Sequence, residues 1–438
     1  YGDRDPLQEV IIEAHLRGME VIPWFEFGFA TSFKSNGGTI IQKFPQWAAL
    51  DREGKLATKN GFEWMNAFDP EVQAFLESLV LEVARKYDVD GIQGDDRMPA
   101  NPSLAGYDEK TKARYFRETG KQVPQDEKDA HWVQWRSDIL TDWLAGLRTK
   151  VKAIDKDLII SMSPSYYSWS KEEYLQDSKT WTEKGLADTL HPQAYRYDFE
   201  AYKKVITDIV KNQFTPEQLP TLAPGLLIKS GKYRIPNAYF LDAIAFNRSM
   251  GVNGEVHFFY TGLRLNNNEL GNLLGDGPYR YPAALPYRSE VWRPVAIDPG
   301  TITINGAAET LKETRTVTAG DKVELTFTIA EPGVYSVLME LPAKSSEFGG
   351  ALRGSIPPTQ PNVSVNPGIR VDLAETNSGG WRSVGKLKRS GVNGTGPGDI
   401  RMVWEVSEAP PGGTRATIGP VKLLLNRKAT NEMKKDAE

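Results

Sequence analysis

Two adjacent acids, Asp95 and Asp96, follow the predicted strand of residues 89–93 after a single glycine, Gly94. Successive side chains of an extended chain point to opposite faces, so Gln93 and Asp95 share one face and Asp96 occupies the other. Two carboxylates at the end of a strand are costly unless they have a task, and general acid–base catalysis is a task that suits them. The structural alternative is that the acid pair caps a turn or pairs with Arg97.

A third acid, Glu26, ends another apolar run and is flanked by Trp24 and by phenylalanines at 25, 27 and 29. Apolar surroundings disfavour a charged carboxylate, as a general acid requires, so we expect Glu26 to donate a proton. Asp95 is then expected to act as nucleophile or base, held ionised by Arg97, with Asp96 as the reserve for either role. A paired structural carboxylate is the competing interpretation of Glu26.

Aromatic and amide side chains gather near the ends of several predicted strands. Aromatic faces stack on sugar rings and amides bond to hydroxyl groups, so this grouping favours a glycan site over packing alone. The candidate substrate-binding residues are Trp24, Trp64, Asn66, Gln93, Arg97, Tyr166, Gln193, Tyr195 and Tyr260.

Composition argues against several competing chemistries. The 438-residue chain has no cysteine, and its four histidines form no H-x-H or H-E-x-x-H pair. Residues 225–232 only approximate a phosphate-binding loop, so we expect neither a metal nor a cofactor. The net charge of −4 gives no electrostatic reason to bind nucleic acid. No apolar run approaches the roughly 20 residues of a transmembrane segment.

The elements that must position these side chains alternate along residues 1–290. Asp69-Pro70-Glu71 opens a helix with a capping acid, and apolar residues follow it at helical spacing. Further helices are predicted over about 131–154, 170–184, 198–212 and 236–250, and strands over 20–27, 89–93, 158–163, 188–195, 219–227 and 255–260. This alternation is typical of parallel strands joined by helical crossovers.

Counting the short run 64–66 as a strand gives seven strands, and the chain opens with a helix over residues 5–17. The sequence therefore predicts a (β/α)₈ TIM barrel whose first strand lies upstream of, or is missing from, this chain. An open doubly wound sheet is the alternative, although the first βα turn lacks the G-x-G-x-x-G pattern.

From about residue 301 the helical period gives way to short alternating stretches separated by turn residues, typical of an antiparallel β-sandwich. Prolines 282, 286 and 294 mark the junction. We therefore predict a catalytic barrel over residues 1–290, a β-sandwich accessory domain over 291–426 and a polar tail over 427–438.

Several motifs resemble, in order, those of the glycosyl-hydrolase-like 10 family: IIEAHLRGMEVIPWFEFGF (11–29), FPQWAALDREG (44–54), WMNAFDPEV (64–72), YDVDGIQGDD (87–96), WRSDILTDWLAGL (135–147) and HPQAYR (191–196). This family includes bacterial enzymes that cut peptidoglycan glycan strands stripped of their peptides. The resemblance covers most of residues 5–262 and implies a (β/α)₈ barrel with a catalytic acid in the Asp95-Asp96 motif. Gly94 and Arg97 depart from the family pattern, which commonly has an aromatic residue before the acid pair and His or Tyr after it.

Together these features predict a glycoside hydrolase whose substrate is a bacterial cell-wall or related polysaccharide. Such an enzyme is expected outside the cytoplasm, in a bacterial envelope or medium, with an export signal upstream of Tyr1. The alternatives are a catalytically inactive glycan-binding protein, which the departures at Gly94 and Arg97 favour, and a structural component of the envelope.

Overall fold

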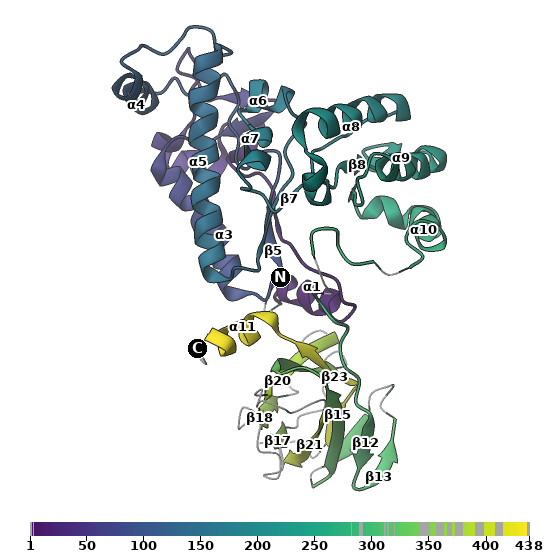
Figure 1. The fold of residues 1–438 in the computed structure, drawn as a ribbon. Helices are drawn as coiled ribbons and strands as arrows, with labels where there is room; N and C mark the ends of the chain where they lie inside the picture. Colours follow the sequence, from purple (N-terminus) through teal and green to yellow (C-terminus); the bar gives the residue numbers. More distant parts are fainter. Residues whose placement is uncertain are drawn as a thin grey trace. The chain divides into compact units, whose positions relative to one another are not determined.

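The structure, a computed structural model, separates into two units by their internal contacts, Ile22–Val291 and the combination of Tyr1–Val21 with Trp292–Glu438. Helices and strands alternate in the first unit, and strands dominate the second (Figure 1). The described residues are 2, 4–281, 283–288, 292–310, 312, 315–318, 320–341, 351–355, 363–365, 370–372, 380–389, 398–407 and 415–435. This division differs from the boundary predicted at residue 290 because residues 1–21 group with the second unit.

The first unit is a mixed α/β fold built on parallel strands. β1 (Trp24–Phe25), β5 (Gly91–Gly94), β6 (Ile159–Met162) and β7 (Thr189–Leu190) form one sheet in that order, and each neighbouring pair is parallel. β8 (Gly225–Leu227) and β11 (Val256–Phe258) form a second parallel pair. Parallel bridges join Leu190 to Leu222 and Gln193 to Gly225, linking the segments around β7 and β8. The parallel pairing predicted from the alternation is therefore confirmed.

Helices follow the strands as connections, and acidic N-caps set where several of them begin. Asp69 accepts a hydrogen bond from the Glu71 backbone at the start of one helix, and Asp129 and Asp198 cap two others. The principal helices of this unit are α3 (Pro70–Lys86), α4 (Glu109–Thr119), α5 (Ala130–Ile154), α6 (Trp169–Tyr174), α7 (Ser178–Glu183), α8 (Phe199–Gln213), α9 (Asn237–Ser249) and α10 (Thr261–Asp276), the last with non-helical residues at 265–268. Among the described residues, no helix has both the length and the hydrophobicity that crossing a bilayer requires.

The expected parallel strand over residues 64–66 is wrong. Residues up to Trp64 instead belong to β4 (Phe62–Trp64), which pairs antiparallel with β2 (Ala30–Phe33) and β3 (Thr58–Lys59) in a separate three-stranded sheet. Asn60 and Gly61 have positive φ values of 54° and 83°, which suit a tight hairpin turn. This turn reverses the chain between β3 and β4 and places β4 in the antiparallel sheet. In the parallel sheet, β1 therefore pairs directly with β5.

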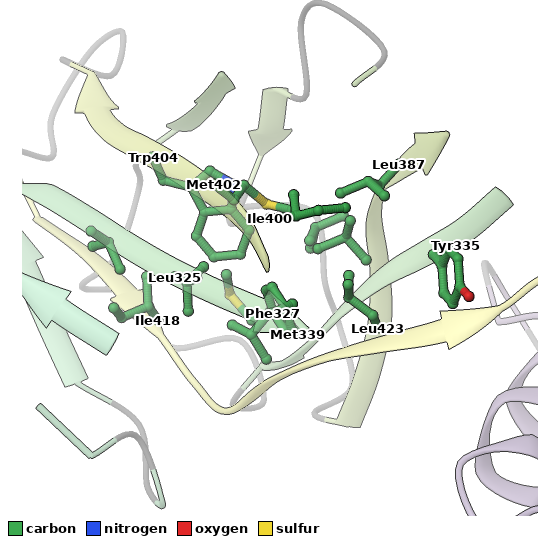
Figure 2. Close-up of a cluster of buried hydrophobic side chains, with 14 of the residues drawn as sticks. Leu325, Phe327, Tyr335, Met339, Leu387, Ile400, Met402, Trp404, Ile418 and Leu423 are labelled. Carbon is green, nitrogen blue, oxygen red and sulfur yellow. The ribbon is translucent and has the colours of Figure 1, made fainter. Parts of the chain in front are cut away.

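The second unit contains antiparallel sheets that bury a common apolar cluster. The six-stranded sheet has the order β13 (Ala307–Glu309), β12 (Thr301–Ile304), β15 (Lys322–Ile329), β21 (Gly398–Ser407), β17 (Ala351–Ser355) and β19 (Arg370–Asp372), and the four-stranded sheet has the order β18 (Val363–Val365), β20 (Gly380–Arg389), β16 (Gly333–Leu341) and β23 (Val421–Leu425). β14 (Arg315–Thr318) pairs with β22 (Arg415–Ile418). Phe327 and Trp404 from the first sheet meet Met339 and Leu423 from the second (Figure 2).

Two helices complete this unit. α1 (Pro6–His15) buries Ile12 against Leu338 and Leu424, which explains why the first residues group with the strands rather than with the parallel sheet. Within the expected polar tail, the structure forms α11 (Arg427–Lys435), where Thr430 is buried and bonds to the backbone of Val334. That segment therefore has a packed helix over its first nine residues.

Candidate active site

The predicted acids lie at the carboxyl edge of the parallel sheet. Phe25, the last residue of β1, is in register with Gly94, the last residue of β5. Glu26 and Asp95 therefore leave neighbouring strands at the same level. In α/β folds this edge is where loops bring catalytic side chains together.

One guanidinium contacts three carboxylates. Arg97 Nη2 lies 2.6 Å from Asp95 Oδ2 and 3.7 Å from Glu26 Oε1, while its Nη1 lies 3.2 Å from Asp96 Oδ1. The Arg97 side chain is only 11% exposed. The structure thus brings together all three predicted catalytic acids around the residue that was predicted to hold Asp95.

Asp95 is the innermost of the three acids. Its side chain is fully buried, and its carboxylate accepts hydrogen bonds from the backbone N–H groups of Phe27 (3.1 Å) and Arg97 (2.8 Å). Burial raises the pKa of Asp95 to about 7, and the charge of Asp96 adds to the rise, although the Arg97 guanidinium and both N–H groups act to lower the pKa. The expectation that Arg97 keeps Asp95 ionised is therefore only partly met, because loss of water outweighs the charge pair.

The other two acids are accessible to solvent. The Asp96 side chain is 28% exposed and that of Glu26 is 62% exposed. The apolar setting expected around Glu26 is wrong, because the carboxylate extends beyond its aromatic neighbours into solvent. Of the two carboxylates in the Asp-Asp motif, Asp96 is the one that a bound ligand could reach.

Glycines allow the loop after β5 to fold closely onto its neighbours. A Cβ atom at Gly94 would lie 2.5 Å from the Met98 carbonyl oxygen and 2.8 Å from the sulfur of Met162. At Gly28 a Cβ atom would lie 2.3 Å from the Arg97 carbonyl oxygen, which also accepts a hydrogen bond from Phe29 at 2.9 Å. There is no room for the aromatic residue that the family pattern commonly has at position 94.

The guanidinium of Arg97 also contacts the rings of two phenylalanines, which the sequence analysis did not single out as site residues. The guanidinium carbon lies 4.5 Å from the centre of the Phe62 ring and 5.6 Å from that of Phe27, and the two rings are 5.5 Å apart. Phe62 comes from the antiparallel β4, so no pattern along the parallel strands marks it. Cation–π contact and the ion pairs together fix the position of the guanidinium.

A second group of aromatic rings joins β1, β11 and the segment after β7. The ring of Trp24 lies 5.9 Å from that of Phe258, and Phe258 stacks on Tyr195 at 5.1 Å. Burial and the nearby charge of Asp96 raise the pKa of Tyr195, and the same two causes raise that of Tyr174 to about 12. Asp96 therefore acts electrostatically on two tyrosines, of which Tyr174 was missed because it belongs to a short helix rather than to a strand end.

Two of the predicted sugar-binding residues do not face solvent. Trp64 is 1% exposed and packs beside Tyr174 at 5.9 Å. Asn66 is 2% exposed, and its amide bonds to Asp108 (3.0 Å), Thr111 (3.2 Å) and the Phe68 N–H (3.0 Å). Both side chains are committed to packing or to internal hydrogen bonds, so a direct contact with sugar is not supported for either.

The remaining candidate residues differ in exposure and in the contacts they make. Gln93 is half-buried within β5, Gln193 donates to the Ser163 carbonyl at 3.2 Å, Tyr166 stacks on Trp169 at 5.9 Å, and Tyr260 is 68% exposed after β11. In the described part of the chain, no three His, Asp or Glu side chains are grouped to hold a metal ion.

Acids and aromatic rings grouped at the carboxyl edge of parallel strands occupy the place where α/β enzymes carry their active sites. The chain belongs to the Glycosyl hydrolase-like 10 family, whose model matches residues 1–244. The resemblance seen in the sequence motifs is thereby confirmed.

The chain is also similar to curated relatives and to a solved structure. The chain is 27% identical over 237 residues to Glycosyl hydrolase DigH of Escherichia coli, a match that covers 47% of this chain and 51% of the relative. It is 23% identical over 317 residues to Glycosyl hydrolase YngK of Bacillus subtilis, covering 64% and 58%. The glycoside hydrolase domain of PgaB (BpsB) from Bordetella bronchiseptica superposes with a TM-score of 0.46 at 15% identity, covering 58% of this chain and 74% of that one. The chain spans little more than half the length of the curated relatives it matches.

Proposed function

We propose that this protein is a glycoside hydrolase that cleaves a bacterial cell-wall or related polysaccharide by two-carboxylate acid–base chemistry. The single observation that carries the proposal is the Arg97 guanidinium, which holds Asp95, Asp96 and Glu26 within 3.7 Å at one edge of the sheet. Hydrolysis of a glycosidic bond needs one carboxyl group to protonate the leaving oxygen and another to act as nucleophile or to activate water. Membership of the family supports the same reaction class.

The exposures of the three acids suggest their roles. Asp96, partly exposed and held by Arg97, serves as nucleophile or base, the role for which it was the reserve. Glu26 protonates the leaving oxygen, because its exposed carboxyl group leaves the neighbouring strand at the same level as the Asp-Asp motif and a bound glycan can reach it. Asp95 pairs with Arg97 and, because it is fully buried, does not touch the sugar.

The substrate would lie across the aromatic rings at the same edge. Trp24 is 39% exposed and packs against Phe258, which in turn stacks on Tyr195. Apolar sugar faces stack on such rings while their hydroxyl groups bond to amides such as that of Gln193.

For the architecture, we propose that the parallel strands belong to a (β/α)₈ barrel. Six strands follow one another in chain order, and the Trp24–Phe258 contact brings side chains of β1 and β11, the first and last of them, together. We propose further that the second unit is a β-sandwich accessory domain and that the protein works outside the cytoplasm. Fractionation of the native host would test the location, and a cytoplasmic protein would contradict it.

The burial of Asp95 also favours a second candidate, an inactive glycan-binding protein on the same fold. A carboxylate that is ion-paired and closed to solvent cannot attack a sugar. Under this alternative Asp96 and Glu26 only bind hydroxyl groups, and the protein binds glycan without turnover.

Release of reducing ends from peptide-free peptidoglycan glycan strands and from a panel of common polysaccharides separates the two candidates. We expect turnover by the wild type and its loss in Asp96→Asn, with Asp142→Asn, an exposed acid on α5, as the matched control. Binding without turnover would establish the inactive protein. Folded Asp95→Asn and Asp96→Asn variants that both keep wild-type rates would overturn the carboxylate assignment.

A further inference from the structure

A second arginine lies at the carboxyl edge, on the segment that follows β7. The guanidinium carbon of Arg196 lies 4.8 Å from the centre of the Tyr166 ring, and its Nη1 donates to the Tyr195 carbonyl at 2.7 Å. Tyr166 follows β6, so this contact joins the loops after two neighbouring strands. The ring and the carbonyl hold the cation half-buried at the rim of the candidate site.

Unlike Arg97, Arg196 has no carboxylate partner among the residues that the structure describes. Asp198, the acid nearest to it in sequence, accepts the Ala201 N–H at 2.8 Å and so caps α8. A guanidinium carries five N–H donors in a planar fork, and the carbonyl bond uses one side of it. Arg196 therefore keeps donors available for an anion that the protein itself does not supply.

The Tyr166 ring that carries this cation belongs to a larger aromatic pair, and two further tyrosines flank Arg196 in the chain. Tyr166 stacks on Trp169, which is 38% exposed, with 5.9 Å between the ring centres and 12° between the planes. Tyr195 precedes Arg196 and stacks on Phe258, and Tyr197 follows it and is 67% exposed. An aromatic pair that could accept a sugar face, with a cation held against one of its rings, suits a sugar that carries a negative charge.

We propose that Arg196 binds a carboxylate carried by the glycan, so that the site is selective for an acidic polysaccharide. The proposal rests on the proposed glycan-directed function and adds the substrate class to it. The acids around Arg97 would repel an anionic substituent placed beside them, since Asp96 and Glu26 alone already outnumber the single guanidinium. Arg196, on the next loop, offers the planar fork that pairs with a carboxylate through two hydrogen bonds.

The test compares peptide-free peptidoglycan glycan strands, which carry carboxylates, with the same strands after chemical reduction of those carboxylates. We expect the wild type to prefer the acidic strands and Arg196→Gln to lose about tenfold in KM or Kd on them, the effect of one charged hydrogen-bonded contact. On the reduced strands the wild type and the variant should agree within about twofold, because the carboxylate is gone. Arg196→Lys should retain part of the preference, since it keeps the charge but not the fork.

Lys211→Gln is the matched control, because Lys211 is an exposed cation near the end of α8, away from the strand ends that carry the acids. Lys211→Gln should leave KM and Kd unchanged on both strand preparations. If Arg196→Gln weakens both preparations equally, Arg196 only supports Tyr166 and the proposal is wrong, while the hydrolase function stands. Equal action of the wild type on both preparations would likewise overturn the proposal alone. If the wild type neither binds nor cleaves either preparation, the proposed cell-wall function fails and this inference fails with it.

Discussion

The guanidinium of Arg97 lies 4.5 Å from the Phe62 ring, although the two residues come from different sheets. Arg97 follows β5 of the parallel sheet, and Phe62 begins β4 of the antiparallel one. A planar cation pressed on a ring has fewer orientations open to it, so the ring helps to keep three carboxylates in one place. The antiparallel sheet thereby contributes to a centre that the parallel strands assemble.

Phe62→Leu should lower kcat while changing KM little. Loss of a cation–π contact worth about 0.5–2 kcal/mol leaves the guanidinium less well fixed, and the expected decrease in rate is about two- to thirtyfold. Phe33→Leu is the control, because the Phe33 ring packs on Phe62 at 5.1 Å and the guanidinium lies over Phe62 and Phe27. Equal effects of the two variants in steady-state kinetics would show that general packing, not the cation contact, is responsible.

The role of Phe62 also shows which part of the site could not be predicted from the sequence. Alternation of strands and helices predicted the parallel pairing, and the capping acids predicted where several helices begin. The Asn60-Gly61 pair is a strong hairpin signal, and it argues against the parallel strand that counting the short run 64–66 predicts. Which distant ring a hairpin brings to an arginine depends on tertiary packing, which no local pattern encodes.

The acids illustrate the same limit at the level of single side chains. Strand alternation predicted that Asp95 and Asp96 point to different faces, and the two do differ in exposure. Alternation does not say which face meets solvent, because the chain turns directly after Gly94 and Phe27, in the segment after β1, supplies an N–H to Asp95. For Glu26, aromatic neighbours in sequence proved a poor guide, since a side chain can point away from residues that flank it.

The buried Asp95 should make stability depend on pH in an unusual direction. Its pKa is about 7 in the folded protein, above the value of roughly 4 of an unfolded aspartate. The folded state therefore binds more protons between these values, and the contribution of Asp95 to stability decreases as pH rises from about 4 to about 7 and is then constant. Thermal unfolding of the wild type and Asp95→Asn across this range should show their Tm difference falling with pH.

A Tm difference that grows with pH would instead mean that Arg97 and the backbone N–H groups keep Asp95 ionised against burial. Asp142→Asn, in which an exposed acid is removed, should show no such trend. The comparison uses variants because other groups titrate in the same range, and only the difference isolates Asp95.

His191 should act in the opposite direction. Both ring nitrogens are bonded, to the Ala223 carbonyl at 2.9 Å and to the Thr189 hydroxyl at 3.1 Å, and burial lowers the pKa of His191 to about 4. The unfolded chain takes up a proton near pH 6.5, so stability is lost as pH falls from about 6.5 towards 4, by about 3 kcal/mol. His191→Asn should flatten this acid limb of the unfolding free energy, measured by urea denaturation, whatever its effect at pH 8. An unchanged slope would contradict a neutral buried histidine.

Glu26→Gln should separate proton donation from the rest of the reaction. A general acid contributes about 10²–10⁴ in rate when the leaving group needs a proton. The variant should therefore be slow on natural glycan and close to the wild type on an aryl glycoside whose leaving group is a stable phenolate. A full rate on natural glycan would mean that the proton donor lies elsewhere, and Glu53→Gln, an exposed acid outside the Arg97 cluster, controls for lost surface charge.

Asn66 should matter for stability and not for sugar binding. Its amide donates to Asp108 and Thr111, and Asp108 in turn caps α4, so Asn66 ties the turn after β4 to the start of that helix. Asn66→Ala leaves buried polar atoms without partners and should lower the free energy of unfolding by about 1–3 kcal/mol. KM should stay within about twofold, since the side chain is closed to solvent. Asn212→Ala, which removes an exposed bond to Asp208 on α8, should cost less than about 0.5 kcal/mol. If Asn66→Ala raises KM at least tenfold without loss of stability, the residue contacts the substrate after all.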